Sequence, residues 1–499
     1  MKNRRTKLLA LILATLLLAG VLSACVKKNG KQKETTTQKN GTILSPDGDS
    51  EETTLYEKDD LPETLNYNHE EFIILCDAAQ YPKSFAETYT GDVINSAIFN
   101  RYDTVCSRLN LDISIVPSSA SAWSGMADFI TQAINMGEGC DLVLAYNLTP
   151  ALMAVQGLTI DLGETSYLNF EKPWWSSVLM ENVSLNGKIY FTGDNSSWNN
   201  LRNMLGVFVD KRLFADNHPD MSVNDLYQMV REKTWTMDQL FELAKNGYRD
   251  TDQDGEVTAA GDTFGFSYAA TNWVEAIYYG AGLRTLQIDE NGEWAFQLTS
   301  SKATALFDYF QAKFFGNNDC IQDAKQYRQF LDGRAQFYIA ALSMVEQGLE
   351  QPFTVIPVPM YQADQGRYYT HFSNSYDMYC IPKTVGENAD RSSAVLECLA
   401  SEAYRQIAPA YFETYLKTQH ASDEYMQEMY DLIRDSITFD LGYCFTMTID
   451  VDGDQPIYYV RRTLRKVAGY ENLSAVWGGV NDAFLEKWKA TVNTLLNNG

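Results

Sequence analysis

Histidine is scarce in this chain, and two familiar catalytic patterns are missing. Only four histidines occur in 499 residues, and neither HExxH nor GxSxG is present. These patterns serve zinc-dependent and serine-dependent hydrolysis, because each holds a ligand, base or nucleophile at a fixed spacing. Pairs of Asp and Glu can hydrolyse glycosides, but no spacing singles out two of them. The sequence therefore favours a protein that is not an enzyme, and a surface enzyme or adhesin acting on glycans stays as the alternative.

The cysteines match neither a metal-binding pattern nor a disulfide framework. Beyond Cys25 there are seven, an odd number, and no two stand in CxxC spacing. Several lie in apolar runs, where a buried thiol packs as a small hydrophobic side chain. The sequence therefore predicts free cysteines in the core.

Basic residues are also fewer than acidic ones. Lys and Arg number 40 against 65 Asp and Glu, for a net charge of −25. Four of the basic residues fall within the first seven positions, so the rest of the chain is more acidic still. Such a chain repels phosphate backbones, and nucleic acid is therefore not an expected partner.

The N-terminus is basic, then apolar, and ends at a cysteine. The apolar stretch 8–22 has the length of a signal-peptide core rather than of a membrane span. The following Leu22-Ser23-Ala24-Cys25 resembles a bacterial lipoprotein lipobox. The resemblance implies that residues 1–24 are a signal peptide, that acyl chains such as palmitate are attached to Cys25, and that this lipid holds the protein at the extracytoplasmic face of the cell membrane. An ordinary secretory signal with a chance cysteine is the alternative.

A polar segment follows the cysteine. Residues 25–69 are rich in Lys, Thr, Gln, Asn, Ser, Asp and Glu, with too few apolar side chains to offset chain entropy. We expect a disordered tether there. The remaining body, about 430 residues, is long enough for two lobes with separate cores.

The first part of the body alternates strand and helix patterns. Apolar runs at 72–76 and 141–146 and alternating residues at 111–115 predict strands. Helical spacing follows Gly91 and recurs over 126–134. This β-α-β-α-β order predicts a mostly parallel sheet with helices on its faces.

Several segments in order resemble one family. They are Asp141–Tyr146, Asn186–Tyr190, Gly206–Phe214, Thr234–Leu240, Phe330–Ala335 and Phe353–Pro359. Together they resemble the extracellular solute-binding proteins of bacterial ABC importers, the family 1 group that includes maltodextrin-binding proteins. The resemblance covers most of residues 70–400, and the last hundred residues fit it poorly.

The resemblance implies a two-lobed α/β fold of the type II periplasmic-binding-protein class, with each lobe a mostly parallel sheet flanked by helices. We expect residues 70–195 and 297–340 in the N-terminal lobe, and 200–296 and 341–499 in the C-terminal lobe. The implied function is to capture a solute by hinge closure and deliver it to a membrane importer. We expect a monomer that binds an oligosaccharide, with a peptide or another polar metabolite as the alternative ligand.

Aromatic residues favour a sugar ligand. Trp, Tyr and Phe make up 13% of the chain, and Tyr alone occurs 30 times. Sugars stack their C–H faces on aromatic rings and bond their hydroxyls to carboxylates and amides. The resemblance implies a cleft contact for Tyr146, Asn147, Trp198, Trp273, Glu275 and Asp377. The alternative for each aromatic side chain among them is a place in the core.

One acidic loop resembles a calcium-binding turn. Asp250, Asp252 and Asp254 alternate and are followed by Gly255 and Glu256, as in an EF-hand loop. The twelfth position is a glycine rather than the usual bidentate glutamate. We expect a structural calcium held by the three aspartates and Glu256, with a bare solvated turn as the alternative, and no required cofactor.

Overall fold

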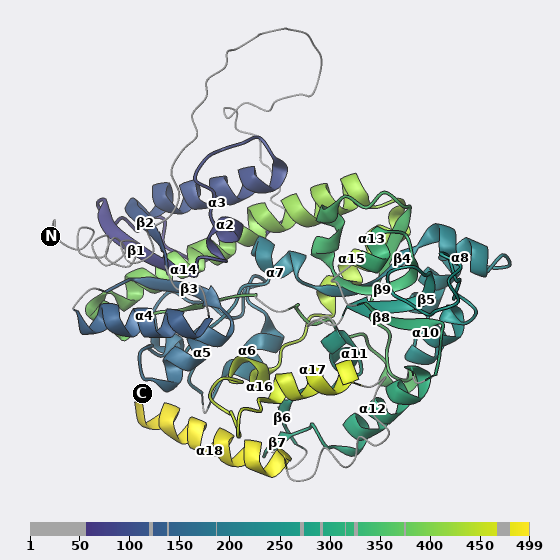
Figure 1. Ribbon diagram of the computed structural model, residues 1–499. Helices are drawn as coiled ribbons and strands as arrows, with labels where there is room; N and C mark the ends of the chain where they lie inside the picture. Colours follow the sequence, from purple (N-terminus) through teal and green to yellow (C-terminus); the bar gives the residue numbers. More distant parts are fainter. Residues whose placement is uncertain are drawn as a thin grey trace, which may run out of the picture.

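The protein folds into two α/β bodies that lie side by side in the computed structural model (Figure 1). One body surrounds a four-stranded sheet and the other a five-stranded sheet. The structure describes residues 56–118, 123–136, 139–185, 187–269, 274–289, 293–314, 316–323, 328–373, 376–466 and 480–498. Cys25 lies outside these residues.

The first sheet has the strand order β11-β3-β1-β2. Its strands are β1 (Glu70–Cys76), β2 (Leu111–Pro117), β3 (Leu142–Tyr146) and β11 (Asp377–Cys380). β1 pairs in parallel with β2 and β3, and β11 is antiparallel to β3. Phe72 to Cys76 and all of β3 are buried, as expected for parallel strands covered on both faces. The predicted alternation of strands and helices is confirmed.

Helices cover this sheet on both faces (Figure 1). They are α3 (Val93–Leu109), α4 (Trp123–Asn135), α5 (Leu148–Val155) and α14 (Ala389–Glu402). Helix α3 begins where Asp92 accepts hydrogen bonds from the backbone N–H groups of Ile94 and Asn95. It ends at Asn110, whose φ of 50° is left-handed. The helix expected after Gly91 is therefore present.

The second sheet has the order β10-β4-β9-β5-β8. Its strands are β4 (Leu205–Asp210), β5 (Phe264–Ala269), β8 (Cys320–Asp323), β9 (Ala335–Ala341) and β10 (Phe353–Ile356). Its main helices are α8 (Lys211–Asn217), α9 (Val223–Arg231), α10 (Met237–Ala244), α12 (Ser301–Phe314) and α13 (Arg328–Leu331). The predicted cap of α10 is confirmed, because the Thr236 side chain accepts a hydrogen bond from Gln239 N.

Strand pairing corrects the expected placement of two segments. Residues 297–340 were expected in the N-terminal lobe, but β8 and β9 pair with strands of the second sheet. Conversely, β11 comes from the segment 341–499 and pairs with β3 in the first sheet. The sequence did not predict this placement, because the fully buried pattern of β9 identifies a central strand but does not show to which sheet the strand belongs.

Three segments cross between the two bodies. Within the described residues they lie at 192–205, at 370–373 with 376–380, and at 436–441, and they pair with one another through isolated bridges. Thr192 pairs with Tyr379, Met204 with Phe372, and Thr370 with Ile437. Crossing segments of this kind form the hinge that the family resemblance predicts.

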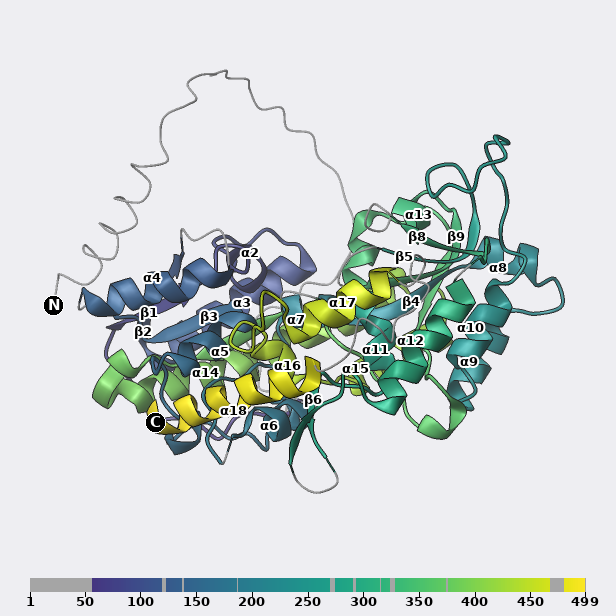
Figure 2. The ribbon, with the colours of Figure 1, turned by 60° about the horizontal axis from the view of Figure 1, so that its bottom comes forward.

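The C-terminal part of the chain connects both bodies. Its elements are α15 (Glu424–Asp435), α16 (Leu441–Cys444), α17 (Pro456–Lys466) and α18 (Val480–Asn498). Helix α18 contacts α5 in the first body and the hairpin strand β7 (Trp294–Phe296), whose partner is β6 (Leu286–Ile288). Figure 2 shows α17 lying between the two bodies. Helix α14 continues through the π-helical turns Ala403–Ile407 and Ala410–His420.

The expected tether is shorter than residues 25–69. Residues 56–69 contact the first body, so the expectation of disorder is wrong for this part. Asp59 forms a bidentate ion pair with Arg108, at 2.6 and 2.7 Å, and Leu61 is buried. A polar composition concealed these contacts because the anchoring groups are themselves charged. Residues 25–55 lie outside the described residues.

Two further expectations concern membranes and cysteines. Within the described residues, no helix combines the length and apolar character needed to cross a membrane. The seven cysteines beyond Cys25 are free, and all except the half-buried Cys106 are buried. The prediction that they form no disulfide framework is confirmed.

Candidate functional site

The strand ends of the two sheets face one short helix. Asp377 begins β11 opposite Tyr146, the last residue of β3, so both lie at the edge where β1 and β3 end. In the second sheet, β9 ends opposite Leu205, the first residue of β4. Helix α7 (Trp198–Arg202) directly precedes β4 and lies between the two bodies (Figure 1). Ligands of α/β proteins commonly bind at such strand ends.

A buried polar network joins α7 to the first sheet. The Ser84 hydroxyl, in α2 (Tyr81–Ser84), donates to Asp377 Oδ2 at 2.9 Å. Asn199 Nδ2 donates to Asp377 Oδ1 at 2.9 Å and to Gln80 Oε1 at 3.1 Å. Burial raises the pKa of Asp377 to about 6, and the Asp194 carboxylate adds to the rise, whereas the Ser84 and Asn199 bonds oppose it. Asp377 therefore fastens the crossing segment to the strand ends.

An ion pair joins α7 to the second body. Arg202 Nε lies 2.9 Å from Glu346 Oε1, in the 3₁₀ helix Leu342–Gln347 that follows β9. The Arg202 guanidinium also lies 4.9 Å from the centre of the Trp198 ring. Trp198 and Glu346 line a pocket of about 320 Å³ together with Phe85 and Tyr415, and the buried Trp198 Nε1 has no partner. Trp198 thus lies on a wall shared by both bodies.

Aromatic side chains cluster beside Tyr146. Tyr376 and Tyr443 both lie close enough to Tyr146 to interact electrostatically, and their ring centres are 6.4 Å apart. His371 stacks on Tyr279 at 3.7 Å, and burial lowers its pKa to about 3. The histidine is therefore neutral at physiological pH. These rings come from α11 (Glu275–Gly280), from one crossing segment and from α16.

A buried ion pair lies next to this cluster. Arg461 on α17 bonds through Nε to Glu275 Oε1 on α11, and both side chains are almost fully enclosed. Burial lowers the pKa of Arg461, but the Glu275 carboxylate outweighs it and the net shift is upward. Arg461 Nη2 is buried and has no partner. This donor remains available for a polar group of a ligand.

Asn147 contributes further unpartnered polar atoms from the first body. It is fully buried, and neither its side-chain oxygen nor its side-chain nitrogen has a partner. Its backbone N–H donates to Tyr376 O at 3.1 Å, which places it beside the aromatic cluster. An unsatisfied buried polar group costs about 1–3 kcal/mol. We call the set Tyr146, Asn147, Glu275, Tyr443 and Arg461 the inter-lobe site.

The structure brings most of the predicted site residues to this region. Tyr146, Asn147 and Glu275 lie in the inter-lobe site, while Asp377 and Trp198 lie along α7. Trp273 lies outside the described residues. Their roles as ligand contacts stay predictions.

Sequence reasoning missed Arg461 and Tyr443. A signal for Arg461 did exist, because it falls on the same face of α17 as Ile457 and Leu464, both fully buried. A charged residue on the buried face of a helix needs a partner, and such positions can be found by periodicity alone.

The acidic loop brings its three aspartates together. Oxygens of Asp250, Asp252 and Asp254 all lie within 4.8 Å of one another, and the side chains are exposed. Glu256 is not part of this group. Asp262, which follows the glycine at the twelfth loop position, accepts hydrogen bonds from the backbone N–H groups of Thr251 and Thr258, at 3.1 and 2.8 Å. The expected calcium site remains a prediction.

Comparisons with known proteins identify the fold. The chain matches no protein-family profile and no curated protein by sequence. Among solved structures, it is similar to the galacto-N-biose/lacto-N-biose I-binding protein of the ABC transporter from Bifidobacterium longum, in complex with lacto-N-biose. The TM-score is 0.54 at 15% identity, over 87% of this chain and 98% of that one. The fold is that of the two-lobed solute-binding proteins.

Two other solved structures agree. A cyclo/maltodextrin-binding protein complexed with maltotetraose has a TM-score of 0.52 at 15% identity, over 85% of this chain and 97% of that one. UgpB from Mycobacterium tuberculosis, in complex with glycerophosphocholine, has a TM-score of 0.50 at 12% identity, over 86% and 98%. The expected type II fold is therefore confirmed, and it occurs with both sugar and non-sugar ligands.

Proposed function

We propose that this protein is the solute receptor of an ABC importer and that it captures an oligosaccharide between its two lobes. The observation that carries the proposal is the pair of unpartnered polar groups at the inter-lobe site. Asn147 comes from the first body and Arg461 from α17, and both are buried without a partner for their free atoms. A polar solute supplies the missing hydrogen bonds.

Capture requires the lobes to move. Tyr146 is 5% exposed, Asn147 0% and Glu275 1%, so the site is sealed in this structure. A solute can enter only when the lobes separate about the three crossing segments. Binding then shifts an equilibrium between an open and a closed form, and the closed form is the one that an importer recognises.

The aromatic character of the site supports a sugar. Tyr146, Tyr376 and Tyr443 provide ring faces, while Asn147 and the Glu275–Arg461 pair provide groups for hydroxyls. Two of the similar structures contain bound oligosaccharides. UgpB in complex with glycerophosphocholine supports the second candidate, another polar metabolite.

A glycan-active enzyme is the weaker candidate. Asp377 and Asp194 are two neighbouring carboxyls with raised pKa values, and burial is the main cause for both. Both are sealed from solvent and bonded to their surroundings: Asp194 accepts from Ser196 N at 2.8 Å, and Asp377 from Ser84 and Asn199. We therefore assign them to the hinge and propose that the protein is not an enzyme.

The remaining parts of the proposal rest on the sequence. The lipobox-like Leu22–Cys25 supports a lipid anchor on Cys25 at the outer face of the cell membrane. The polar composition of the segment that follows Cys25 supports a tether that holds the receptor near a permease. We propose a monomer in this role, without nucleic acid or a required cofactor.

A thermal-shift screen tests the proposal. The unlipidated chain 26–499 is scanned against mono- and oligosaccharides, short peptides and glycerophosphodiesters, and each stabilising compound is recovered and analysed. A solute that binds only the native state raises Tm by mass action. An intact oligosaccharide that raises Tm supports the proposal. A cleaved glycan would contradict it, and a shift by peptides or diesters alone would overturn the sugar assignment.

A further inference from the structure

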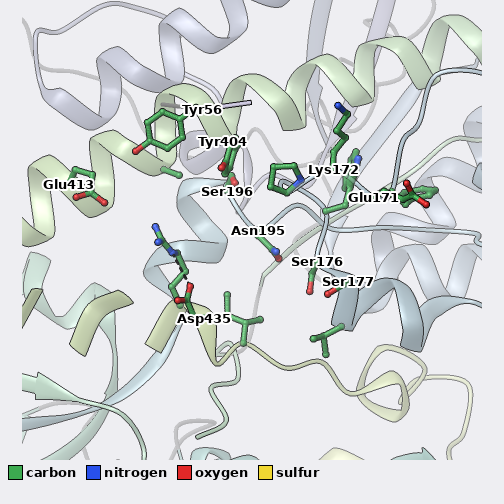
Figure 3. Close-up of a pocket in the computed structure, with 17 residues that line it drawn as sticks. Tyr56, Glu171, Lys172, Ser176, Ser177, Asn195, Ser196, Tyr404, Glu413 and Asp435 are labelled. Carbon is green, nitrogen blue, oxygen red and sulfur yellow. Dashed lines mark ion pairs between the residues drawn. The ribbon is translucent and has the colours of Figure 1, made fainter. Parts of the chain in front are cut away.

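A second cavity lies at the hinge, separate from the inter-lobe site. It has a volume of about 530 Å³, and Figure 3 shows the residues that line it. One wall comes from the first body at 170–178, another from the π-helical turns at Tyr404 and Glu413, and a third from the end of α15 at Asp435. The crossing segments contribute Asn195, Ser196 and Ile437. No residue of the inter-lobe site lines this cavity, which we call the hinge pocket.

The charges around the hinge pocket are predominantly negative. Both lining cations already have carboxylate partners: Lys172 lies 2.7 Å from Glu57 and from Asp60. Arg434 lies 3.4 Å from Asp431 and 3.8 Å from Asp435.

Carboxylates remain in excess on both sides of the pocket. Glu171 and Glu413 stand on opposite sides of Asn195 in Figure 3, and both are exposed. Glu413 has one lysine partner, Lys417, at 3.1 Å, and that lysine also pairs with Asp431. A cationic ligand therefore meets an attractive potential, whereas an anion is repelled.

Aromatic rings line the same pocket. Tyr56 packs edge-on against Tyr404 at 5.4 Å, and Phe170 packs edge-on against Trp175 at 5.5 Å. Burial and the Glu413 carboxylate raise the pKa of Tyr56, so its ring stays neutral. Neutral aromatic faces attract ammonium groups through their quadrupole.

One polar atom in the hinge pocket lacks a donor. Asn195 Oδ1 is buried and has no hydrogen-bond partner. Figure 3 shows this side chain in the middle of the pocket. A ligand N–H group supplies the donor that this oxygen needs, whereas a purely apolar ligand leaves it unsatisfied.

We propose that the hinge pocket is a second ligand site, which binds a small aliphatic ammonium ion at the end where Glu413 lies next to the Tyr56 and Tyr404 rings. An ammonium group pairs with Glu413, and the aliphatic chain packs against the Tyr56 and Tyr404 rings and extends toward Asn195. The site goes beyond the proposed solute function and does not depend on it. Because its walls include two crossing segments and α15, its occupancy is linked to lobe movement.

Calorimetric titration of the unlipidated chain 26–499 tests this site. The probe is putrescine, and 1,4-butanediol is the uncharged analogue of the same length. We expect putrescine to bind at least about tenfold more tightly than the diol, since charge and cation–π attraction both require the ammonium group. We also expect the affinity to fall several-fold between low and high salt, because the carboxylates are exposed.

Two variants locate the binding. Glu413→Gln removes one exposed carboxylate without touching the core and should weaken putrescine binding about two- to fivefold. Tyr404→Leu removes one ring face and should weaken it about fivefold or more. Glu164→Gln is the matched control, because Glu164 is also exposed on the first body but lies outside the pocket, and it should bind like the wild type.

The outcomes separate this site from the inter-lobe site. Asn147→Leu should leave putrescine affinity unchanged, because Asn147 does not line the hinge pocket. The proposal is overturned if putrescine does not bind in the millimolar range, or if the diol binds equally well. It is also overturned if Asn147→Leu abolishes putrescine binding while Glu413→Gln leaves it unchanged.

Discussion

The inter-lobe site and the hinge pocket are built by the same two bodies, but they differ in solvent access and in how far their polar groups are paired. The inter-lobe site is sealed, and it contains the unpartnered amide of Asn147 and the free Nη2 of Arg461. The hinge pocket is open, and its two lining cations are already paired with carboxylates. A sealed site with unsatisfied groups is costly without a ligand, whereas an open one is not.

This difference suggests different roles. Without solute, the cost at the inter-lobe site favours open lobes, so that water can reach Asn147 and Arg461. The hinge pocket contains one such atom, Asn195 Oδ1, so the corresponding cost there is smaller. The main solute therefore drives closure, while an ammonium ion at the hinge only adjusts it.

The largest expected effect comes from breaking the sealed ion pair. Arg461→Met removes the cation that neutralises the buried Glu275 carboxylate, which should lower the free energy of unfolding by about 3–5 kcal/mol. Urea denaturation measures the loss. The double variant Glu275→Gln with Arg461→Met should recover most of it, since neither residue is then charged. A single variant as stable as the wild type would show that the pair is not sealed in solution.

Replacing Asn147 should favour closure of the lobes without solute but weaken solute binding. Asn147→Leu removes an amide that is unsatisfied when the lobes close without solute, so the closed ligand-free form should gain about 1–3 kcal/mol relative to the open one, while solute affinity should fall at least about tenfold. Small-angle X-ray scattering of the ligand-free variant and calorimetric titration measure the two effects. Asn224→Leu, at an exposed position of α9, is the control and should change neither. Equal solute affinity in the Asn147 variant would remove this residue from the site.

Glu397 accepts a hydrogen bond at 2.9 Å from Nε1 of Trp175, which lines the hinge pocket. Burial raises its pKa to about 7. An acid with a raised pKa in the folded state stabilises the fold below its unfolded pKa, and this contribution is lost as pH rises through about 7. Glu397→Gln should therefore be more stable than the wild type by about 1–3 kcal/mol at pH 9 and similar to it at pH 4.

Melting curves across this pH range measure the difference. Glu387→Gln, at an exposed glutamate on the same body, is the control and should follow the wild type. A constant difference between Glu397→Gln and the wild type at all pH values would contradict the assigned titration.

The smallest effect is expected where the N-terminal segment meets the first body. Burial raises the pKa of Asp59, but the Arg108 guanidinium outweighs it and the net shift is downward. The stability that this pair contributes is therefore present above the unfolded pKa and lost as pH falls through the lower folded value. Asp59→Asn should release residues 56–61 to proteases without unfolding the body. Limited proteolysis followed by mass spectrometry checks this, and an unchanged cleavage pattern would argue against the contact.

Local sequence patterns predicted the individual strands and helices. The assignment of strands to sheets depends on tertiary pairing, which local patterns do not show. The strand at Leu142–Tyr146 and the cap at Thr236 follow from apolar runs and capping chemistry, both of which are local. The sheet to which Ala335–Ala341 belongs is decided by neighbours far away in the chain. The family resemblance pointed to Tyr146 and Asn147 at the end of a predicted strand, but sequence reasoning missed Arg461, whose partner lies 186 residues away.

Small-angle X-ray scattering of the unlipidated chain, with and without the solute found by the thermal screen, tests the central claim most directly. The account predicts that the ligand-free protein has a larger radius of gyration than its sealed structure, and that solute lowers the value to that of the sealed form. An unchanged radius of gyration on saturation with solute would contradict closure of the lobes over a ligand.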